Sequence, residues 1–402
     1  MAKEKWMRVR HKIINEIVRL ILHPYSIIKY GIKVEKFKEQ NGRQYLVLFN
    51  HQTAFDQFFV GMAFKGNIYF LASEDLFSKG WISSVIRYII APIPIKKQTT
   101  DIGAIKNCMR VAKEGGTIAL APEGNRTFRG KTEYMNPSIA SLAKKLGLPI
   151  ALFRIEGGYG VHPRWSDVVR KGKMKGYVSQ VIEPEDYKDL SNEQLFDIIE
   201  KGLYVDEANG ENIFNHQKRA EFLERVFYVC PYCGLAEFET YGHHIECKKC
   251  HKVISFEPNT ELKGEGFEFP FRFVSDWYDY QQDFVNSLDL NEYTAAPLFK
   301  DKIQLSEVIV YKNKNLLLES AEISLFGDKF IIDDGKENPI TFPFKDIMAV
   351  TILGKNKLNI YFDRKIYQLK GSKRFNALKY LNIYNRYINI SRGVLNGKFL
   401  GL

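Results

Sequence analysis

The sequence predicts three consecutive parts: an α/β domain, a short cysteine-containing segment and a β-rich C-terminal domain. Short apolar runs alternate with helical periodicity between about residues 44 and 155, a pattern typical of layered α/β structures. Two CxxC pairs follow, and successive strand patterns then dominate. The expected boundaries are 1–40 for an amphipathic membrane-surface segment, 41–228 for the α/β domain, 229–258 for the cysteine segment, 259–300 for a connecting segment and 301–390 for the β-rich domain.

The α/β part is expected to contain a mixed sheet with flanking helices. Its strands are predicted at Gln44–Phe49, Ile68–Leu71, Ile93–Ile95, Thr117–Ala121 and Ile150–Ile155. Its helices are predicted at about 54–64, 81–90, 101–113 and 137–146, and helical patterns return over 191–228. Gly115 and Gly147 are suited to end two of these helices.

The N-terminal 40 residues are strongly basic. They contain ten Lys or Arg and four acidic residues, so their net charge is 10 − 4 = +6 of the +11 of the whole chain. Apolar residues recur among them every three or four positions: Trp6, Val9, Ile13, Ile17, Leu20 and Ile21. A basic amphipathic helix of this kind can lie among the headgroups of an anionic membrane surface. The alternative is a helix that packs its apolar stripe on its own domain.

The chain is not expected to cross a membrane. The apolar stretch Leu20–Ile28 is interrupted by His23 and Pro24, whereas a spanning helix needs roughly 20 apolar residues. A cleavable signal peptide is not expected either. We therefore expect peripheral or monotopic attachment at the cytoplasmic face of the cell membrane.

Four of the five cysteines form two pairs, Cys230–Cys233 and Cys247–Cys250, with thirteen residues between them. Each CxxC turn places two thiolates on one side, and two such turns complete a tetrahedral Zn²⁺ site. The spacing therefore predicts a small zinc ribbon with a structural ion, with disulfides as the alternative. The fifth cysteine, Cys108, lies in a helical pattern and is interpreted as a core thiol.

A histidine and an aspartate lie where the first predicted strand meets the first predicted helix. His51 falls in the loop and Asp56 in the first helical turn, so their side chains can meet. A carboxylate can hold an imidazole in one tautomer while the other ring nitrogen takes a proton from an alcohol. We therefore interpret His51 and Asp56 as candidate catalytic residues.

A second polar cluster follows the strand at Thr117–Ala121. Gly124 allows close approach of the backbone to a ligand, and Arg126 offers a planar fork of donors that suits a phosphate. Gly124 and Arg126 are therefore candidate substrate-binding residues, and Lys97, Glu123 and Asn125 join them only through the family resemblance described next.

Together, His51–Asp56 and Glu123–Arg126 resemble the two main motifs of the PlsC-type glycerol-phosphate acyltransferases, most closely the bacterial 1-acylglycerol-3-phosphate acyltransferases. Ile93–Lys97 resembles an intervening motif that usually ends in Arg, and Gly147–Ile150 resembles a later strand motif. Asn125 stands where Thr is common in the family. The resemblance covers roughly residues 10–190.

The resemblance implies acyl transfer from acyl-CoA or acyl-carrier protein to the free hydroxyl of 1-acyl-glycerol-3-phosphate, giving phosphatidic acid. It implies that His51 is the general base, that Asp56 orients it, and that Glu123, Gly124 and Arg126 contact the acceptor phosphate, with Lys97 adding a cation. No catalytic cofactor and no covalent acyl-enzyme are expected. Because Lys97 replaces a bidentate Arg, another lysophospholipid remains an alternative acceptor.

The C-terminal region reads as seven or eight short strands from about residue 303 to residue 369 and a closing helix at about 374–388. This order of elements resembles a small barrel of the pleckstrin-homology (PH) or GRAM type.

Two non-catalytic classes remain as alternatives. One is a zinc-ribbon nucleic-acid-binding protein, which the net charge of +11 permits. The other is a lipid-binding adaptor built on the C-terminal domain. We expect no nucleic-acid partner, because the basic charge concentrates in the apolar-striped N-terminal segment and not around the cysteines.

Overall fold

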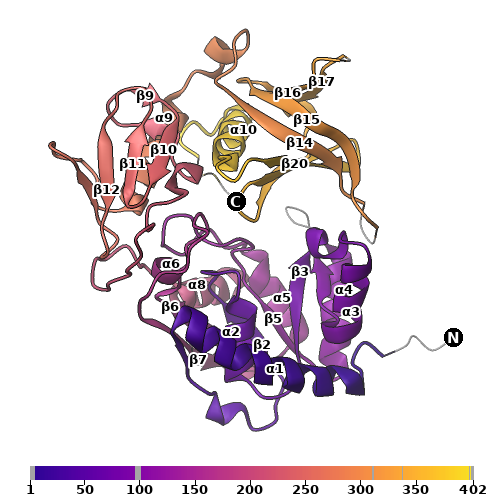
Figure 1. Ribbon diagram of the computed structural model, residues 1–402. Helices are drawn as coiled ribbons and strands as arrows, with labels where there is room; N and C mark the ends of the chain where they lie inside the picture. The colour runs from indigo at the N-terminus through magenta and orange to yellow at the C-terminus, as the bar shows by residue number, and fades with distance from the viewer. Residues whose placement is uncertain (1–4, 96–100, 310–311, 337, 398, 400–402) are drawn as a thin grey trace. The chain divides into compact units, whose positions relative to one another are not determined.

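The computed structural model describes residues 5–95, 101–309, 312–336, 338–397 and 399. They form two compact units (Figure 1), and each is described by itself. Unit 1 consists of Met1–Arg164 and Val169–Asn215, and unit 2 consists of Trp165–Val168 and His216–Leu402.

Unit 1 contains a seven-stranded mixed sheet flanked by helices. In spatial order the strands are β1 (Ile32–Val34), β7 (Met174–Ile182), β6 (Ile150–Glu156), β2 (Leu46–Phe49), β5 (Thr117–Leu120), β3 (Ile68–Ser73) and β4 (Ile93–Ile95). Strands β6 and β7 run antiparallel, and the other neighbouring pairs described are parallel. The prediction of a mixed sheet is therefore confirmed.

Most helices of unit 1 lie close to their predicted positions. The helices are α1 (Val9–Tyr30), α2 (Asp56–Ala63), α3 (Trp81–Ile90), α4 (Ile102–Lys113), α5 (Ser138–Leu146), α6 (Gly158–Val161), α7 (Pro184–Tyr187) and α8 (Asn192–Leu203), with 3₁₀ turns η1 (Lys38–Gln40) and η2 (Glu74–Phe77). The short helices α6 and α7 were not predicted. No helix among the described residues combines the length and apolar character that crossing a membrane requires.

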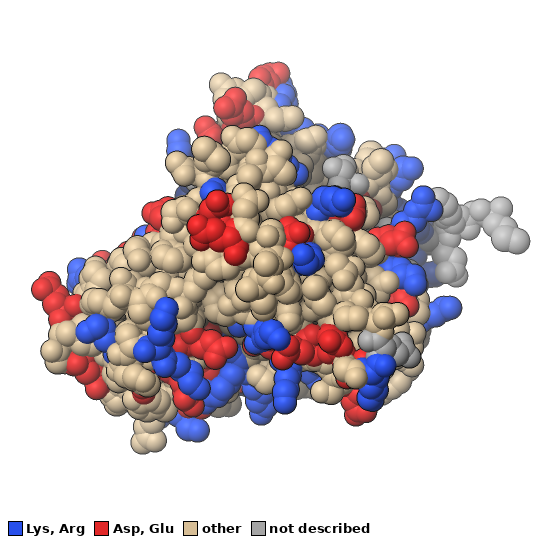
Figure 2. Space-filling model, turned by 90° about the horizontal axis from the view of Figure 1, so that it is seen from above, with Lys and Arg blue, Asp and Glu red and all other residues tan. Residues whose placement is uncertain are grey.

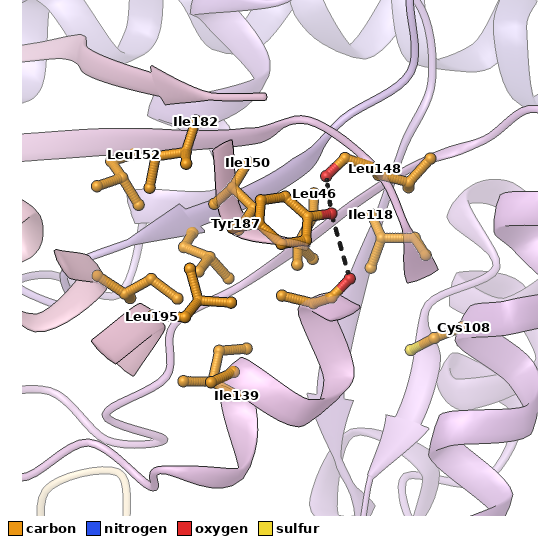
Figure 3. Close-up of a cluster of buried hydrophobic side chains, with 14 of the residues drawn as sticks. Leu46, Cys108, Ile118, Ile139, Leu148, Ile150, Leu152, Ile182, Tyr187 and Leu195 are labelled. Atoms are coloured by element: carbon orange, nitrogen blue, oxygen red, sulfur yellow. Dashed lines mark hydrogen bonds between the residues drawn. The ribbon is translucent and has the colours of Figure 1, made fainter. Parts of the chain in front are cut away.

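The central strands are buried on both faces. Successive side chains of a strand point to opposite sides, so each strand contributes to two cores. In β2, Leu46 and Leu48 join the core on the side of α4, α5 and α8, whereas Val47 and Phe49 join the core beneath α1 and α2. In the first of these cores (Figure 3), the Tyr187 hydroxyl donates to the Leu148 carbonyl over 2.8 Å. Cys108 is fully buried in the same core, which supports its interpretation as a core thiol.

Strands β1 and β7 were not among the predicted elements. The sequence of β7 mixes polar residues and a glycine with its apolar positions, so its pattern is weak. Its glycine has a packing reason: a Cβ at Gly176 would lie 2.8 Å from the Phe153 ring. Pairing with β6 and β1, rather than local pattern, makes this segment a strand.

The helical prediction for residues 191–228 holds only as far as α8. Beyond α8, long-range backbone bonds replace helical ones: Lys171 and Asn215 exchange hydrogen bonds of 2.8 and 3.0 Å, and the Thr132 amide donates to the Val205 carbonyl. Of the predicted stretch after residue 203, only the 3₁₀ turn η3 (Leu223–Arg225) is helical.

Unit 2 begins with small antiparallel sheets that carry the cysteines. Their strands are β8 (Val229–Cys230), β9 (Gly234–Leu235), β10 (Phe238–Tyr241), β11 (His244–Cys247), β12 (Val253–Phe256) and β13 (Leu262–Gly264). The region expected to be a connecting segment contains α9 (Val274–Ser287) and η4 (Leu290–Tyr293). The Trp277 side chain of α9 is fully buried and stacks on Phe227 at 3.6 Å between ring centroids.

The remainder of unit 2 is a curved antiparallel sheet closed by one long helix. Its strand order is β17-β16-β15-β14-β20-β19-β18. The elements are β14 (Phe299–Glu307), β15 (Asn315–Leu325), β16 (Lys329–Asp333), β17 (Ile340–Pro343), η5 (Phe344–Asp346), β18 (Ala349–Leu353), β19 (Lys357–Phe362), β20 (Lys365–Gly371) and α10 (Ala377–Ser391). The prediction of a β-rich C-terminal region with a closing helix is confirmed.

Candidate active site

Two loops at the carboxyl ends of β2 and β5 form the centre of the candidate site. These strands are parallel neighbours, with Leu48 opposite Leu120, so the loops that follow them leave the sheet at the same edge. The Thr127 amide donates to the His51 carbonyl over 3.2 Å and joins the two loops directly. The two motifs, about seventy residues apart in the sequence, are therefore adjacent in the structure.

His51 and Asp56 are in contact, as their spacing predicts. His51 Nδ1 lies 2.8 Å from Asp56 Oδ2. The Asp56 side chain is completely buried, whereas 23% of the His51 side chain is exposed. The imidazole thus contacts a buried carboxylate through one nitrogen, and part of its ring is accessible to a substrate.

The Asp56 carboxylate is fixed by donors of its own loop. The Gln52 amide donates to it over 2.6 Å, the Thr53 amide over 2.9 Å and the Thr53 hydroxyl over 2.7 Å. A carboxylate that receives these bonds is the acceptor in its bond with His51. The His51 proton therefore lies on Nδ1, and Nε2 is the ring nitrogen with a lone pair.

Glu123 is a structural link between the two loops. One of its oxygens accepts from the His51 amide and the other from the Glu133 amide, each over 2.7 Å. Burial raises the pKa of Glu123 well above its usual range, although these two amides act in the opposite direction. Both oxygens are occupied by the backbone, so Glu123 holds the position of the His51 backbone.

Arg126 carries a buried guanidinium nitrogen, Nη1, without a hydrogen-bond partner among the described residues. Burial lowers the pKa of Arg126, whereas Asp56 and Tyr30 act to raise it. Its loop is held by Arg164, which donates to the Arg126 carbonyl over 3.0 Å and to Asn125 Oδ1 over 3.5 Å. Gly124 is exposed and has φ = +68°, a conformation that favours glycine.

One predicted site residue, Lys97, lies outside the described residues. Two others that matter were not singled out from the sequence. Thr53 bonds Asp56 at a spacing of three residues, a short-range pattern that Ser and Thr often form before a helix. Tyr30, the last residue of α1, reaches the candidate site only through the fold, where its ring packs on Phe55, the residue before Asp56.

A family of known proteins matches this part of the chain. Residues 31–155, which include both loops, match a family model described as Acyltransferase. This part of the chain is an acyltransferase-family domain. The resemblance that the two motifs indicate is thereby confirmed.

The curated relatives of this acyltransferase domain are all named as the same kind of enzyme. A 1-acyl-sn-glycerol-3-phosphate acyltransferase of Bacillus subtilis is 25% identical over 128 residues, which is 32% of this chain and 60% of that protein. The chloroplastic 1-acyl-sn-glycerol-3-phosphate acyltransferase LPAT1 of Arabidopsis thaliana is 23% identical over 158 residues, 38% of this chain and 43% of that protein. The chain thus spans about two fifths to three fifths of these relatives' lengths.

Solved structures are also similar to this chain. One of them is the crystal structure of the 1-acyl-sn-glycerophosphate acyltransferase PlsC from Thermotoga maritima, with 22% identity and a TM-score of 0.41. The similarity covers 49% of this chain and 80% of that one.

Outside the acyltransferase domain, the four predicted metal ligands come together in unit 2. The sulfur atoms of Cys230, Cys233, Cys247 and Cys250 all lie within 4.8 Å of one another. The Cys230–Cys250 and Cys233–Cys247 sulfur pairs are 3.7 and 3.6 Å apart. A disulfide needs about 2.05 Å, whereas four sulfurs about 2.3 Å from one ion are about 3.8 Å apart in a tetrahedron. The cluster therefore has the dimensions of a metal-binding site.

Proposed function

We propose that this protein is a 1-acylglycerol-3-phosphate O-acyltransferase, an enzyme of phospholipid biosynthesis. The acceptor hydroxyl oxygen forms an ester bond with the carbonyl carbon of an acyl thioester, either acyl-CoA or acyl-carrier protein. The carbon–sulfur bond breaks, the thiol leaves with the proton, and the product is phosphatidic acid. The names of the curated relatives support this acceptor, and another lysophospholipid is the alternative.

The observation that carries the proposal is the His51–Asp56 pair at the end of β2. With its proton held on Nδ1 by Asp56, His51 can accept the acceptor's hydroxyl proton at Nε2 as the new ester bond forms. Asp56 stabilises the imidazolium that results. The proton then passes to the departing thiolate, so the residue returns to its starting state without a covalent acyl-enzyme.

In this proposal Arg126 binds the acceptor phosphate, supported by its buried guanidinium nitrogen, which has no hydrogen-bond partner among the residues described. Gly124 lets the backbone approach the ligand, and Asn125 is held by Arg164 and shapes the loop. Glu123 takes a different role from the phosphate contact expected from the resemblance: its oxygens bond backbone amides, and it positions His51. Lys97 stays a candidate second cation for the phosphate.

An anionic membrane surface is the proposed site of action, because helix α1 exposes its apolar stripe. Val9 is 81% exposed, Leu20 77% and Ile28 85%, while the buried residues of α1 are His11, Ser26 and Tyr30. The stripe residues within α1 are thus exposed, whereas Trp6, which precedes the helix, packs on the core of its own domain. The neighbouring helix α3 adds exposed Trp81 and Tyr88, and Arg10 of α1 donates to the Tyr88 carbonyl. We propose peripheral attachment through α1 and α3 at the cytoplasmic face of the membrane.

We further propose that the cysteine cluster binds a structural Zn²⁺ and that residues 301–390 form a PH/GRAM-like domain. The distances between the sulfurs fit four thiolates around one ion. The seven-stranded antiparallel sheet closed by α10 supports the second assignment. The proposed domain boundaries remain those expected from the sequence, with α9 included in the connecting segment.

The non-catalytic alternatives have less support. A nucleic-acid-binding protein presents a field of basic side chains, whereas Figure 2 shows acidic side chains interspersed with basic ones across the face it draws. A non-catalytic lipid-binding adaptor does not require a histidine in contact with a buried carboxylate, whereas general-base catalysis does.

The test is a matrix of acyl donors and acceptors. Purified protein is incubated with labelled acyl-CoA or acyl-carrier protein and with 1-acyl-glycerol-3-phosphate, glycerol 3-phosphate or 1-acyl-glycerophosphocholine. We expect labelled phosphatidic acid with the first acceptor. Efficient transfer only to the choline lipid would replace the acceptor assignment, and no transfer with any pair would refute the enzyme assignment.

A further inference from the structure

Tyr30, the last residue of α1, carries a hydroxyl that the fold leaves without a partner beside the candidate site. The residue is 2% exposed, and its hydroxyl is buried without a hydrogen-bond partner among the described residues. The exposed Tyr25 of the same helix differs, because its hydroxyl accepts from Lys29 over 2.7 Å. A buried phenol normally finds a partner, so the Tyr30 hydroxyl requires an explanation.

The ring of Tyr30 is fixed against the start of α2. It lies 5.1 Å from the Phe55 ring and 5.7 Å from the Phe59 ring, centroid to centroid, and 5.8 Å from the His162 ring. Phe55 directly precedes Asp56, so this packing places Tyr30 at the helix turn that carries the proposed orienting carboxylate. The ring is held by three aromatic neighbours and does not need its hydroxyl for packing.

Arg126 supplies a second buried donor, its guanidinium Nη1, beside the candidate site. The charged groups that act on the Tyr30 hydroxyl include Arg126 and Asp56, and the groups that act on Arg126 are Asp56 and Tyr30. Both groups lie beside the His51–Asp56 loop, because the Tyr30 ring packs on Phe55 and the amide of Thr127, next to Arg126, donates to the His51 carbonyl. Neither the Tyr30 hydroxyl nor Arg126 Nη1 has a hydrogen-bond partner among the described residues. Burial raises the pKa of Tyr30, so its phenol keeps its proton and remains a donor at physiological pH.

We propose that Tyr30 is a second donor for the acceptor phosphate: its hydroxyl and the Arg126 guanidinium bind oxygens of the same phosphomonoester. This inference rests on the proposed function and adds a residue to its binding site. A phosphate oxygen accepts from both groups at once and satisfies two buried donors. Helix α1 then carries both the exposed apolar stripe and a residue that binds phosphate. The same helix would therefore contact the membrane and bind the headgroup of the lipid acceptor.

The test compares Tyr30→Phe with the matched control Tyr25→Phe. Because the Tyr30 hydroxyl has no hydrogen-bond partner in the described part of the chain, its removal should leave the thermal midpoint unchanged or higher. In detergent-dispersed assays, Tyr30→Phe should raise the KM for 1-acyl-glycerol-3-phosphate about tenfold or more, as expected for a hydrogen bond to a charged group. The donor KM should change less than twofold, and Tyr25→Phe should change neither constant.

A double-variant cycle separates a shared ligand from two independent effects. If one phosphate joins Tyr30 and Arg126, Tyr30→Phe combined with Arg126→Ala should raise the acceptor KM by less than the product of the single effects. Binding of glycerol 3-phosphate, measured by calorimetry, should weaken in the same order without any need for turnover.

Each outcome decides one point. An acceptor KM and a glycerol 3-phosphate affinity equal to wild type in a stably folded Tyr30→Phe protein would overturn the Tyr30 assignment. A midpoint several degrees lower would also overturn it, since the hydroxyl would then be structural. If the wild-type protein binds glycerol 3-phosphate through Tyr30 but transfers no acyl group, the proposed function fails and the binding assignment stands.

Discussion

At the residue scale, His51 and Asp56 are held in different ways. The His51 backbone is anchored at both ends, by Glu123 at its amide and by Thr127 at its carbonyl. Its side chain contacts the Asp56 carboxylate over 2.8 Å. Asp56, in contrast, is buried and accepts from the Gln52 and Thr53 amides, so its side chain organises the loop itself.

This difference predicts two separable phenotypes. His51→Ala should lower kcat by about 10²–10⁴ with an unfolding midpoint close to wild type, because both backbone anchors remain. Asp56→Asn should lose activity and also about 1–3 kcal/mol of stability, because one amide nitrogen would face backbone donors. Denaturant unfolding and acyl-transfer assays on the same preparations measure both. Near wild-type turnover in a folded His51→Ala protein would remove His51 from the mechanism.

Glu207 is a buried carboxyl group that holds the turn after β6. It accepts from the Gly157 amide over 2.6 Å and from the Tyr159 amide over 3.1 Å. Burial raises the pKa of Glu207 from 4.5 to about 7, although these backbone donors act in the opposite direction. The folded state therefore holds the Glu207 proton more tightly than the unfolded state does.

A raised carboxyl pKa makes folding less favourable as pH rises. Between pH 4.5 and about 7 the folded state binds more protons at Glu207 than the unfolded state. The free energy of unfolding should consequently fall across this window, by roughly 3 kcal/mol for this group. Unfolding curves at half-unit pH steps for wild type and Glu207→Gln measure the contribution as the difference between the two profiles. Parallel profiles would show that Glu207 does not titrate in this window.

At the element scale, α1 contributes to the fold as well as to the proposed membrane surface. Its last residue, Tyr30, is buried in the core beneath α2, and the next strand, β1, pairs with β7. Deleting residues 1–33 would therefore damage the sheet and the candidate site together. Substitutions on the exposed stripe isolate membrane attachment more cleanly.

We expect Leu20→Gln combined with Ile28→Gln to weaken binding to anionic vesicles about tenfold or more, because two apolar side chains no longer enter the lipid. The unfolding midpoint should not change, since both residues are highly exposed. Met348→Gln, at a 68% exposed residue of unit 2, is the matched control. Vesicle sedimentation at low and high salt measures the effect, and salt should weaken only the part due to charge.

The same variant should lose activity on vesicle-embedded acceptor but keep it on detergent-dispersed acceptor. Equal sedimentation of the wild-type and doubly substituted proteins would contradict the proposed role of the α1 stripe.

At the scale of the whole molecule, the chain consists of two units with different means of stabilisation. Unit 1 is built around apolar layers on both faces of its sheet. Unit 2 contains the short strands of the cysteine ribbon, which bury side chains such as Ile245 and Phe256 and also gather four thiolates. A metal ion would supply the cross-link there, as in other small ribbons.

We expect one Zn²⁺ per chain in protein purified without chelator, measured by elemental analysis. Trp277 provides an optical probe, because its indole donates to the Val229 carbonyl, next to Cys230, over 2.9 Å. Chelation should loosen the ribbon and change tryptophan fluorescence, and Trp277→Phe should abolish most of that change. Thiols found as disulfides in freshly lysed cells, together with zinc-free protein, would contradict the prediction.

Local sequence pattern was sufficient to predict many of the strands and two of the side-chain clusters. Short apolar runs located β2, β5 and β6 to within two residues, because strands that are buried on both faces are apolar at consecutive positions. The motif spacing placed His51 beside Asp56, since five residues across a loop and one helical turn bring the side chains together. The CxxC spacing likewise predicted the sulfur cluster, because each turn positions its pair of thiols locally.

Contacts between residues far apart in the sequence determined the features that local pattern did not predict. No local signal shows that the apolar stripe of α1 faces away from the domain, that Glu123 bonds the His51 backbone, or that β7 pairs with β1. Tyr30 and Arg126 are separated by 95 intervening residues, and long-range packing places both beside the His51–Asp56 loop. Sequence periodicity reports which face of an element is apolar, whereas the partner of that face depends on the arrangement of all the elements at once.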